Sequence, residues 1–431
     1  MARIVLGVAG GIAAYKACEL LRRLTEAGHA VRVVPTAAAL RFVGVPTWAA
    51  LSGQPVATDV WDGVHEVPHV RLGQQADLVV VAPATADLVA RAAHGLADDL
   101  LTNTLLTARC PVVYAPAMHT EMWEHPATAA NVATLRARGA VVVEPAVGRL
   151  TGADSGKGRL PEPDELFFLV GRVLARRDRL ATAPGSAASV FAAGAAGLLL
   201  DLAGRHVVVT AGGTREPLDP VRFLGNRSSG KQGYAFARTA VARGARVTLV
   251  SANVALPDPA GAEVVRVGTT EELRKATLEA AASADTVVMA AAPADFRPAE
   301  YAQSKIQKSA DGPAPVLRLV TNPDIAAELG GRRRPGQVLV AFAAETAARQ
   351  AATEESTAGG AAAGVLARGR AKLERKRADL IVVNEVGVDR VFGADSNAAT
   401  VLGADGSTVT ITERSKEDLA DAVWDLVVAR L

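Results

Sequence analysis

The feature that most constrains the fold is an alternation of short β-branched runs with amphipathic segments, which occurs twice along the chain. Such runs are typical of parallel strands buried on both faces. In the first half they cover residues 4–8, 31–34, 78–81, 112–114 and 141–143. Between two of them, Leu20, Leu21 and Leu24 share one helical face within residues 17–27, and Gly28 follows. The alternation predicts a parallel α/β sheet that binds ligands at the carboxyl ends of its strands.

The second half repeats this pattern after a break in composition. Its β-branched runs cover residues 207–210, 247–250, 287–289, 338–341 and 380–383. Residues 177–204 are rich in Ala, Gly, Ser and Pro, which predicts a linker or a loosely packed helix, and residues 353–369 are interpreted as a mobile insertion. Because 431 residues exceed one core, we predict two Rossmann-like three-layer α/β domains with mostly parallel sheets. They are placed at residues 1–178 and 205–431, with a linker at 179–204.

Composition narrows the classes of function. The net charge is +2 and the basic residues are spread along the chain, so neither nucleic acid nor a membrane surface is an expected partner. Cys18 and Cys110 lie among apolar residues, which predicts buried thiols in a reducing compartment. The first residues lack a signal-peptide cleavage site, and no apolar run reaches the ~20 residues of a membrane span. These features predict a cytoplasmic protein.

A strand followed by two glycines indicates a phosphate site in the first half. Gly10 and Gly11 stand where a helix is predicted to begin, and free N–H groups at a helix start favour a phosphate. The third glycine of the dinucleotide fingerprint is missing, and the second strand ends at Thr36 without an acidic residue. A mononucleotide therefore fits better than NAD, although an NAD-linked reductase remains an alternative.

Residues 114–125 concentrate residue types that are rare elsewhere in the chain, including two of its four Met and two of its seven His. A metal site, a flavin pocket or a core helix could each collect them. The spacing of His119, Met122 and Trp123 first predicts a core-facing helical stripe.

His69 reads from spacing alone as a surface histidine beside a strand. A zinc site shared with His65 is disfavoured. Pro68 opposes a helix there, and in an extended chain the two rings would lie about 13 Å apart.

Three segments together resemble the flavin-dependent cysteine decarboxylases, in particular the phosphopantothenoylcysteine decarboxylases of coenzyme A biosynthesis: residues 7–16, 68–101 and 116–123. The resemblance implies FMN held between subunits of a trimer. It also implies that FMN oxidises the cysteine carbon of the substrate, which makes the carboxylate a good leaving group, and then reduces the enethiolate. The family histidine matches His69, which would act as a base or orienter near the thiol. The implied flavin contacts are Gly10, Gly11, Ile12, Thr36, Ala84, Thr85, Ala86 and Ala117.

Two positions depart from this family. His119 stands where the family has an asparagine that holds the substrate carboxylate, and Gly152 stands where it has a cysteine that protonates the enethiolate. Candidate proton donors are therefore Thr151, Asp154, Ser155 or water. The departures also leave a flavin-binding regulatory protein with an inactive decarboxylase half as an alternative. In this interpretation Met122 and Trp123 are packing anchors for the segment at 114–125.

The second half carries a ligand-type loop at residues 210–233, directly after a strand. Residues 206–397 resemble the phosphopantothenate-cysteine ligases that bacteria fuse behind the decarboxylase. The resemblance implies that CTP activates the phosphopantothenate carboxylate as an acyl-cytidylate and that the cysteine amine displaces CMP. Asn226 would assist the first step. The implied CTP contacts are Met289, Ala290, Ala291, Asp295, Lys305, Asn322, Pro323, Asp324, Ile325, Phe342, Lys372 and Lys376.

Departing pyrophosphate needs fixed cations and Mg²⁺, and Lys305 is the leading candidate among the side chains. The family often has consecutive lysines here, whereas this chain has Lys305 and Lys308 separated by two uncharged residues. The sequence leaves the metal ligands unknown.

We therefore predict a bifunctional enzyme with small-molecule partners: phosphopantothenate, cysteine, CTP and phosphopantothenoylcysteine. The second half would ligate cysteine, and the first half would decarboxylate the product. The resemblance further implies trimers of the first domain joined through dimers of the second, which close as a dodecamer.

Overall fold

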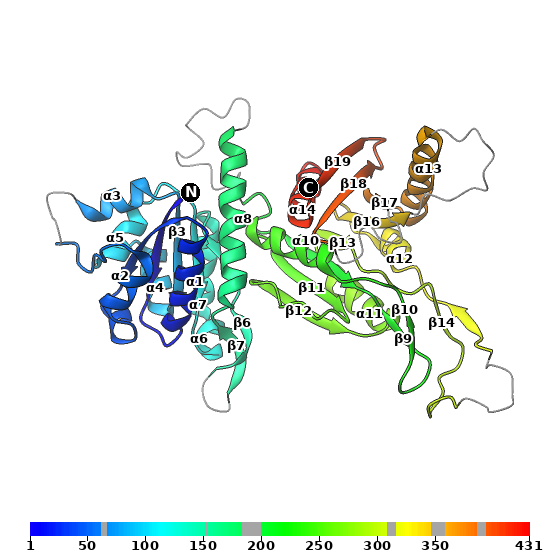
Figure 1. Ribbon diagram of the computed structural model, residues 1–431, viewed down its shortest axis with the longest axis horizontal. Helices are drawn as coiled ribbons and strands as arrows, with labels where there is room; N and C mark the ends of the chain where they lie inside the picture. The colour runs from blue at the N-terminus through cyan, green and yellow to red at the C-terminus, as the bar shows by residue number, and fades with distance from the viewer. Residues whose placement is uncertain (62–66, 151–153, 183–199, 308–315, 346–357, 386–393) are drawn as a thin grey trace. The chain divides into compact units, whose positions relative to one another are not determined.

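The computed structural model describes residues 1–61, 67–150, 154–182, 200–307, 316–345, 358–385 and 394–431 (Figure 1). The chain divides into two compact units. The first consists of Met1–Gly204, Val241–Ala245 and Pro259–Gly261, and the second of Arg205–Ala240, Arg246–Asp258 and Ala262–Leu431. None of the helices in the described part of the chain combines the length and apolarity that crossing a bilayer requires.

The first unit is built on a five-stranded sheet in the order β2-β1-β3-β4-β5, with every neighbouring pair parallel. The strands are β1 (Arg3–Val8), β2 (Ala30–Pro35), β3 (Leu78–Ala84), β4 (Val112–Pro116) and β5 (Val141–Val142). All five predicted strands are confirmed. The strand order reverses direction between β1 and β3, and doubly wound sheets bind ligands outside the carboxyl ends at such a point.

Helices and one hairpin complete the first unit (Figure 1). They are α1 (Ala14–Glu26), η1 (Ala39–Arg41), α2 (Val45–Ser52), α3 (Pro68–Gln75), α4 (Ala86–His94), α5 (Leu100–Thr107), α6 (Thr120–Glu124), α7 (Pro126–Ala137), α8 (Pro163–Thr182), β6 (Ala146–Arg149) and β7 (Ser155–Arg159). Helix α1 buries Leu20, Leu21 and Leu24 as predicted. Helix α8 continues through Thr182, beyond the predicted domain end at residue 178.

Two expectations for the first unit were wrong. Pro68 opens helix α3 instead of opposing it, because the first helical position has no N–H bond to lose and favours the fixed φ of proline. The thiols of Cys18 and Cys110 are half-buried rather than fully buried. Burial still raises the pKa of Cys110 to about 12.

The second unit is built on an eight-stranded sheet in the order β12-β11-β8-β13-β16-β17-β18-β19. Its strands are β8 (His206–Gly212), β11 (Arg246–Ala252), β12 (Ala262–Val267), β13 (Thr286–Met289), β16 (Val338–Glu345), β17 (Leu380–Glu385), β18 (Ser396–Gly403) and β19 (Thr408–Ser415). The five predicted strands are confirmed, and β12, β18 and β19 were missed. The first six strands in this order are parallel, while β18 and β19 are antiparallel additions at one edge.

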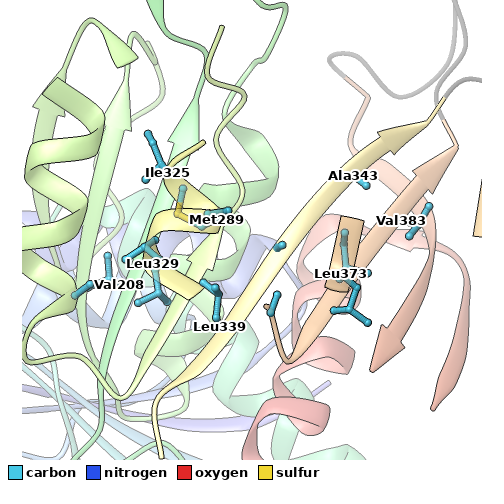
Figure 2. Packing of buried hydrophobic residues seen from close by; sticks show 14 of the residues in the cluster. Val208, Met289, Ile325, Leu329, Leu339, Ala343, Leu373 and Val383 are labelled. Atoms are coloured by element: carbon cyan, nitrogen blue, oxygen red, sulfur yellow. The ribbon is translucent and has the colours of Figure 1, made fainter. Parts of the chain in front are cut away.

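Helices cover both faces of this sheet. On one face, α11 (Thr270–Ala281), α12 (Ile325–Arg332) and α13 (Ala358–Lys376) bury a core that includes Val208, Met289, Leu339 and Leu373 (Figure 2). On the other face lie α10 (Lys231–Ala242) and α14 (Lys416–Val428). There the Phe236 ring packs edge-on against Phe342 at 5.6 Å and against Trp424 at 5.4 Å. The predicted class, α/β domains with mostly parallel sheets, is confirmed.

Helix α13 corrects one further prediction. Residues 358–369, expected to belong to a mobile insertion, are helical. Alanine is the best helix former, and its abundance here outweighs the glycines. The start of the predicted insertion, residues 353–357, lies outside the described residues, as do most of the predicted linker and Gly152.

One short hairpin precedes helix α11 along the chain, and another follows it. Strand β9 (Arg215–Pro217) pairs with β10 (Phe223–Gly225), and β14 (Phe296–Pro298) pairs with β15 (Leu319–Thr321), both antiparallel.

Candidate functional site

A cavity of about 530 Å³ lies at the carboxyl ends of β13, β16 and β17 in the second unit. Every predicted nucleotide contact except Lys305 lines it, and so does Asn226. These residues are Met289, Ala290, Ala291, Asp295, Asn322, Pro323, Asp324, Ile325, Phe342, Lys372 and Lys376. The size is that of a small-molecule site, and its place at the strand ends is where open α/β sheets bind ligands.

The loop after β13 forms one wall because hydroxyl groups fix its backbone. The Ala291 N–H donates to Thr210 Oγ1 at 3.1 Å, and the Ala294 N–H donates to Thr214 Oγ1 at 2.8 Å. Both threonines are fully buried. The wall is therefore made largely of backbone, held in place before any ligand arrives.

Asn322 ties the turn before α12 to this wall. Its Nδ2 donates to Ala294 O at 2.9 Å and to Thr270 Oγ1 at 3.3 Å, while Arg297 donates to its Oδ1 at 2.8 Å. The buried Glu216 carboxylate in turn accepts two hydrogen bonds from Thr270. Both the oxygen and the nitrogen of the Asn322 side chain are therefore hydrogen-bonded within the chain, and Asn322 positions the turn.

Charged side chains cluster where α12 and α13 line the cavity. Asp324 caps α12, accepting from the Ala327 N–H at 3.1 Å, and Lys376 Nζ donates to Asp324 Oδ1 at 2.8 Å. Burial opposes ionisation of Asp324, but the Lys376 ammonium, the Ala327 N–H and nearby Arg375 outweigh it and hold its pKa below the ordinary value. Lys372 lies one helical turn before Lys376. This end of the cavity therefore suits an anionic ligand.

The loop before α10 forms the facing wall. Asn226 donates from Nδ2 to Pro293 O at 2.8 Å, which joins this loop to the loop after β13. A Cβ at Gly213, which directly follows β8, would lie 2.6 Å from Asn226 O, so the close approach of the chain after β8 to this loop requires glycine there. Sequence reasoning marked this loop as ligand-binding but selected Asn226 alone. The structure adds Ser228, Ser229, Gly230, Lys231, Gln232, Arg375, Asn384, Asn397 and Lys416 to the lining.

Lys305 is not brought to the cavity. Its side chain is exposed, and the residue is absent from the cavity lining. The adjacent Ile306 is tied elsewhere: its N–H donates to Asp219 Oδ2 at 3.1 Å, and its carbonyl accepts from Arg222 at 2.8 Å. Lys308 lies outside the described residues.

In the first unit, the predicted flavin contacts follow four neighbouring strands. Gly10 and Gly11 follow β1, Thr36 follows β2, Thr85 and Ala86 follow the end of β3 at Ala84, and Ala117 follows β4. Backbone bonds join these corners: the Ala9 N–H donates to Pro83 O at 3.1 Å, and the Ala117 N–H donates to Ala84 O at 3.1 Å. The predicted residues thus meet at the β1/β3 reversal of the sheet.

This edge has features that fit a flavin phosphate and ring. A Cβ at Gly10 would lie 2.3 Å from the Ala38 Cβ, so the corner is packed around glycine. The hydroxyl of Thr36 accepts from the Ala39 N–H, and that of Thr85 caps α4. Ile12 is 73% exposed, an apolar surface that a bound ring would cover. Glycine backbone, two hydroxyls and an uncovered apolar side chain together match the demands of FMN.

His69 is the second residue of α3. Its carbonyl accepts from Thr107 Oγ1 at 2.8 Å, which fixes the backbone. Its Nδ1 is buried and makes no hydrogen bond within the described part of the chain. A buried polar atom left in this state is a common mark of a functional group.

The segment at 114–125 is not the core stripe that its spacing predicts. His119 and Met122 are exposed, with Met122 at 48%, so Met122 is not a packing anchor within this chain. Trp123 is half-buried against the core of the first unit. Helix α6 is only one turn long, so the helical period cannot be maintained toward one face.

The hairpin β6/β7 reaches the same segment. The Met118 N–H donates to Gly158 O at 3.0 Å, and a Cβ at Gly158 would lie 2.1 Å from Met118 O. Asp154 and Ser155, two of the candidate proton donors, stand at the start of β7, whereas Thr151 lies outside the described residues.

No group of three or more His, Cys, Asp or Glu side chains suited to a metal ion occurs among the residues that the structure describes.

Comparison with known families divides the chain in two, as the two compact units do, with the second part beginning close to residue 204. Residues 1–174 match the flavoprotein family, and residues 202–431 match the family of the DNA/pantothenate metabolism flavoprotein C-terminal domain.

Several curated relatives match over the whole chain, and each carries the name coenzyme A biosynthesis bifunctional protein CoaBC. That of Mycolicibacterium smegmatis is 57% identical over 100% of this chain and 98% of its own length. That of Mycobacterium tuberculosis is 56% identical over 100% and 97%. That of Bacillus subtilis is 39% identical over 99% and 96%.

Solved structures resemble each half. The C-terminal domain of a coenzyme A biosynthesis bifunctional protein CoaBC is 31% identical, covering 53% of this chain and 97% of that one, with a TM-score of 0.42. A PPC decarboxylase mutant complexed with pantothenoylaminoethenethiol is 31% identical, covering 39% of this chain and 96% of that one, with a TM-score of 0.37.

The matches confirm the predicted pairing of a flavoprotein half with a ligase-type half, and they do not favour a flavin-binding regulatory protein. Full-length identity with the curated relatives establishes that this chain belongs to the family of bifunctional coenzyme A biosynthesis proteins, in which a decarboxylase-type flavoprotein domain precedes a ligase-type domain.

Proposed function

We propose that the second unit joins cysteine to 4'-phosphopantothenate at the expense of CTP and that the first unit decarboxylates the product with FMN. One observation carries the nucleotide assignment. Contacts implied by family resemblance, dispersed from Asn226 to Lys376 along the chain, line a single cavity at the carboxyl edge of the sheet.

The ligase reaction needs two displacements in that cavity. A carboxylate oxygen of phosphopantothenate attacks the α-phosphorus of CTP, and the bond from that phosphorus to the pyrophosphate oxygen breaks. The cysteine nitrogen then attacks the acyl carbon, forms the amide bond and loses a proton, while CMP leaves with the electron pair of the broken C–O bond. Asn226 lies in the wall of the cavity, where its amide can steady the carboxylate during the first attack.

Cations would stabilise the charge that develops on pyrophosphate. Lys372 and Lys376 line the cavity and would contact CTP, as would the backbone at Met289–Ala291 and the turn at 322–325. Mg²⁺ would enter bound to the triphosphate, since it is usually held by phosphates and one or two carboxylates. Asp295, on the cavity wall, would supply such a carboxylate. Lys305 remains a proposed contact for pyrophosphate, although it does not line this cavity.

In the first unit, bound FMN would supply two-electron oxidation and reduction at the thiol-bearing carbon of the substrate. Gly10 and Gly11 would hold its phosphate, and the corners after β2, β3 and β4 would surround the ring. His69 would orient or deprotonate the thiol through its ring. His119 would donate a hydrogen bond to the substrate carboxylate, taking the place of the family asparagine. Asp154, Ser155, Thr151 or water would supply the final proton.

The proposed assembly is a dodecamer of trimers and dimers. Exposed apolar side chains on the two hairpins of the second unit support a dimer contact: Phe223, Leu224, Phe296, Leu319 and Val320. We place the enzyme in the cytoplasm, with no nucleic acid or membrane partner, since the cofactors and substrates proposed are small polar molecules.

A product assay tests the proposal. Purified protein loaded with FMN and given CTP, Mg²⁺, phosphopantothenate and cysteine should release CMP, pyrophosphate and CO₂. Omitting cysteine should stop CMP and CO₂ release. The proposal would be contradicted if CMP were released at the same rate without phosphopantothenate. It would also be contradicted if the protein bound NAD in preference to FMN.

A further inference from the structure

A network of buried side chains lies behind the nucleotide cavity without lining it. Its members are Thr214, shortly after β8, Glu216 on β9 and Thr270 at the first position of α11. Each is at most 3% exposed, and none of the three is among the residues that line the cavity. Two cavity residues, Ala294 and Asn322, are hydrogen-bonded to the network. The network therefore supports the cavity wall from outside the cavity.

The hydroxyl hydrogens of this network have one consistent arrangement, which the carboxylate sets. A carboxylate accepts but does not donate, and Glu216 Oε1 accepts from the Thr270 N–H at 2.9 Å and from the Thr270 hydroxyl at 2.8 Å. A hydroxyl has one hydrogen, so Thr214 is the donor in the Thr214–Thr270 hydrogen bond of 2.9 Å. The oxygen of Thr214 accepts from the Ala294 N–H at 2.8 Å. The hydrogen bonds thus run in one direction, from the cavity wall to Glu216.

The same arrangement directs the amide of Asn322. Because the Thr270 hydroxyl donates to Glu216, its oxygen is left to accept from Asn322 Nδ2 at 3.3 Å. The amide nitrogen also donates to Ala294 O at 2.9 Å, and Arg297 donates to the amide oxygen at 2.8 Å. Asn322 therefore holds the turn before α12 against the loop after β13, with its nitrogen directed by the network and its oxygen by Arg297.

Glu216 lies where a carboxylate is stable. Thr270 is the first residue of α11, so its N–H has no acceptor within the helix, and the helix dipole favours a negative charge there. Removing the carboxylate would leave this buried N–H without its acceptor and allow the Thr270 hydroxyl to donate to Thr214 instead. The hydrogen bonds to Ala294 and Asn322 would then no longer have a single arrangement.

We propose that Glu216 is a positioning residue for the nucleotide, acting through Thr270 and Thr214 on the loop after β13 and the turn before α12. This inference rests on the proposed function of the second unit, since CTP is the ligand that the loop and the turn would contact. Glu216 lies outside the cavity lining, so its effect is on nucleotide binding rather than on the chemical step. A wall that is less fixed has to be ordered when CTP binds, which weakens the affinity.

Changes at Glu216 test the positioning role. Glu216→Ala should raise the KM for CTP about tenfold, while kcat and the KM for cysteine stay within about threefold of wild type. Glu216→Gln should bring the KM for CTP back to within about threefold of wild type, because a single oxygen accepts both bonds from Thr270.

Glu272→Ala is the matched control. Glu272 is exposed and completes the capping box of the same helix with Thr269, so its loss weakens the start of α11 outside the network. The KM for CTP in Glu272→Ala should stay near wild type. An equal rise of this KM in Glu272→Ala and Glu216→Ala would show that any loosening of α11 has the same effect, and would overturn the positioning role.

A double-mutant cycle tests the path through Thr270. Thr270→Val removes the hydroxyl with little change of shape and should by itself raise the KM for CTP about fivefold, which keeps the role testable if Glu216→Ala is unstable. In the double variant the KM should stay within about twofold of the more impaired single variant, because both changes break one chain of hydrogen bonds.

Acyl-cytidylate formation without cysteine, followed as pyrophosphate release, separates the two proposals. If wild type forms no acyl-cytidylate, the proposed function fails and this inference fails with it. If it does, the positioning role alone is overturned by an unchanged KM for CTP in Glu216→Ala or Thr270→Val, or by additive effects in the double variant.

Discussion

The two candidate sites differ in how much of each site a single chain completes. In the second unit the predicted contacts surround a cavity of about 530 Å³ that is closed by two loops, two helices and three strand ends. In the first unit the predicted flavin contacts meet at one edge of the sheet, but one of them, Ile12, is 73% exposed, and Met122 on α6 is 48% exposed. An uncovered apolar surface at a cofactor edge favours completion by another copy. The comparison suggests that nucleotide binding needs one chain, while flavin chemistry needs the assembly.

The largest expected effect separates the two chemistries. His69→Asn should lower CO₂ release by about 10²–10⁴-fold, because it removes the imidazole proposed to orient or deprotonate the substrate thiol, whereas CMP release from the same sample should remain. His94→Asn, an exposed histidine at the end of α4, is the control and should leave both rates near wild type. Equal loss of CMP and CO₂ release in His69→Asn would contradict independent sites.

A smaller effect should follow from filling the flavin corner. Gly10→Ala forces a Cβ to within 2.3 Å of the Ala38 Cβ, and overpacking of this kind costs about 1–3 kcal/mol. We expect weaker FMN binding, about tenfold, measured by flavin fluorescence. Gly171→Ala is the control, since a Cβ there meets nothing within 4 Å and alanine should stabilise α8 by about 0.5–1 kcal/mol. Retained FMN affinity in Gly10→Ala would argue against this corner.

The nucleotide cavity is probed by Lys376→Met. The change removes a cation from the lining and leaves Asp324 without its 2.8 Å partner, so the KM for CTP should rise about tenfold, in keeping with the worth of charge-assisted hydrogen bonds. Lys275→Met, an exposed lysine on α11, should have no such effect. An unaltered KM for CTP in Lys376→Met would place the triphosphate elsewhere.

The smallest effect concerns stability in acid. The pKa of Asp324 is lowered in the folded state, so its stabilising contribution is present above the unfolded pKa of about 4 and is lost as pH falls through the folded value. Asn can still cap α12 but loses the ion pair with Lys376, so Asp324→Asn should lower the free energy of unfolding modestly at pH 7 and flatten its further loss below about pH 4. Urea unfolding at several pH values measures it, and an identical acid slope in both proteins would contradict the assignment.

Sequence patterns predicted the fold more completely than the sites. Every strand predicted from a β-branched run is present, because such runs have few alternatives to a buried parallel strand. Strand β12 was missed because its burial is only partial, and β19 because it is largely exposed at the sheet edge. Helix α3 was missed because Pro68 was treated as a breaker, although it is the first helical residue.

Local sequence patterns predicted the site residues less completely than the strands. Resemblance supplied residues at loop corners, and the structure places nearly all of those for CTP on one cavity. Asn397 and Lys416 carry no local motif, since they reach the cavity only through the antiparallel edge of the sheet and the start of the last helix. Lys305 illustrates the opposite case: its charge suggested the cavity, but its neighbour Ile306 is bonded to Asp219 and Arg222.

The most direct test of two separate sites is to remove FMN from the full chain and follow CMP and CO₂ release together. With CTP, Mg²⁺, phosphopantothenate and cysteine present, the stripped protein should still release CMP while CO₂ release stops, and added FMN should restore about one CO₂ for each CMP. Continued CO₂ release without flavin, or loss of CMP release on stripping, would contradict the account.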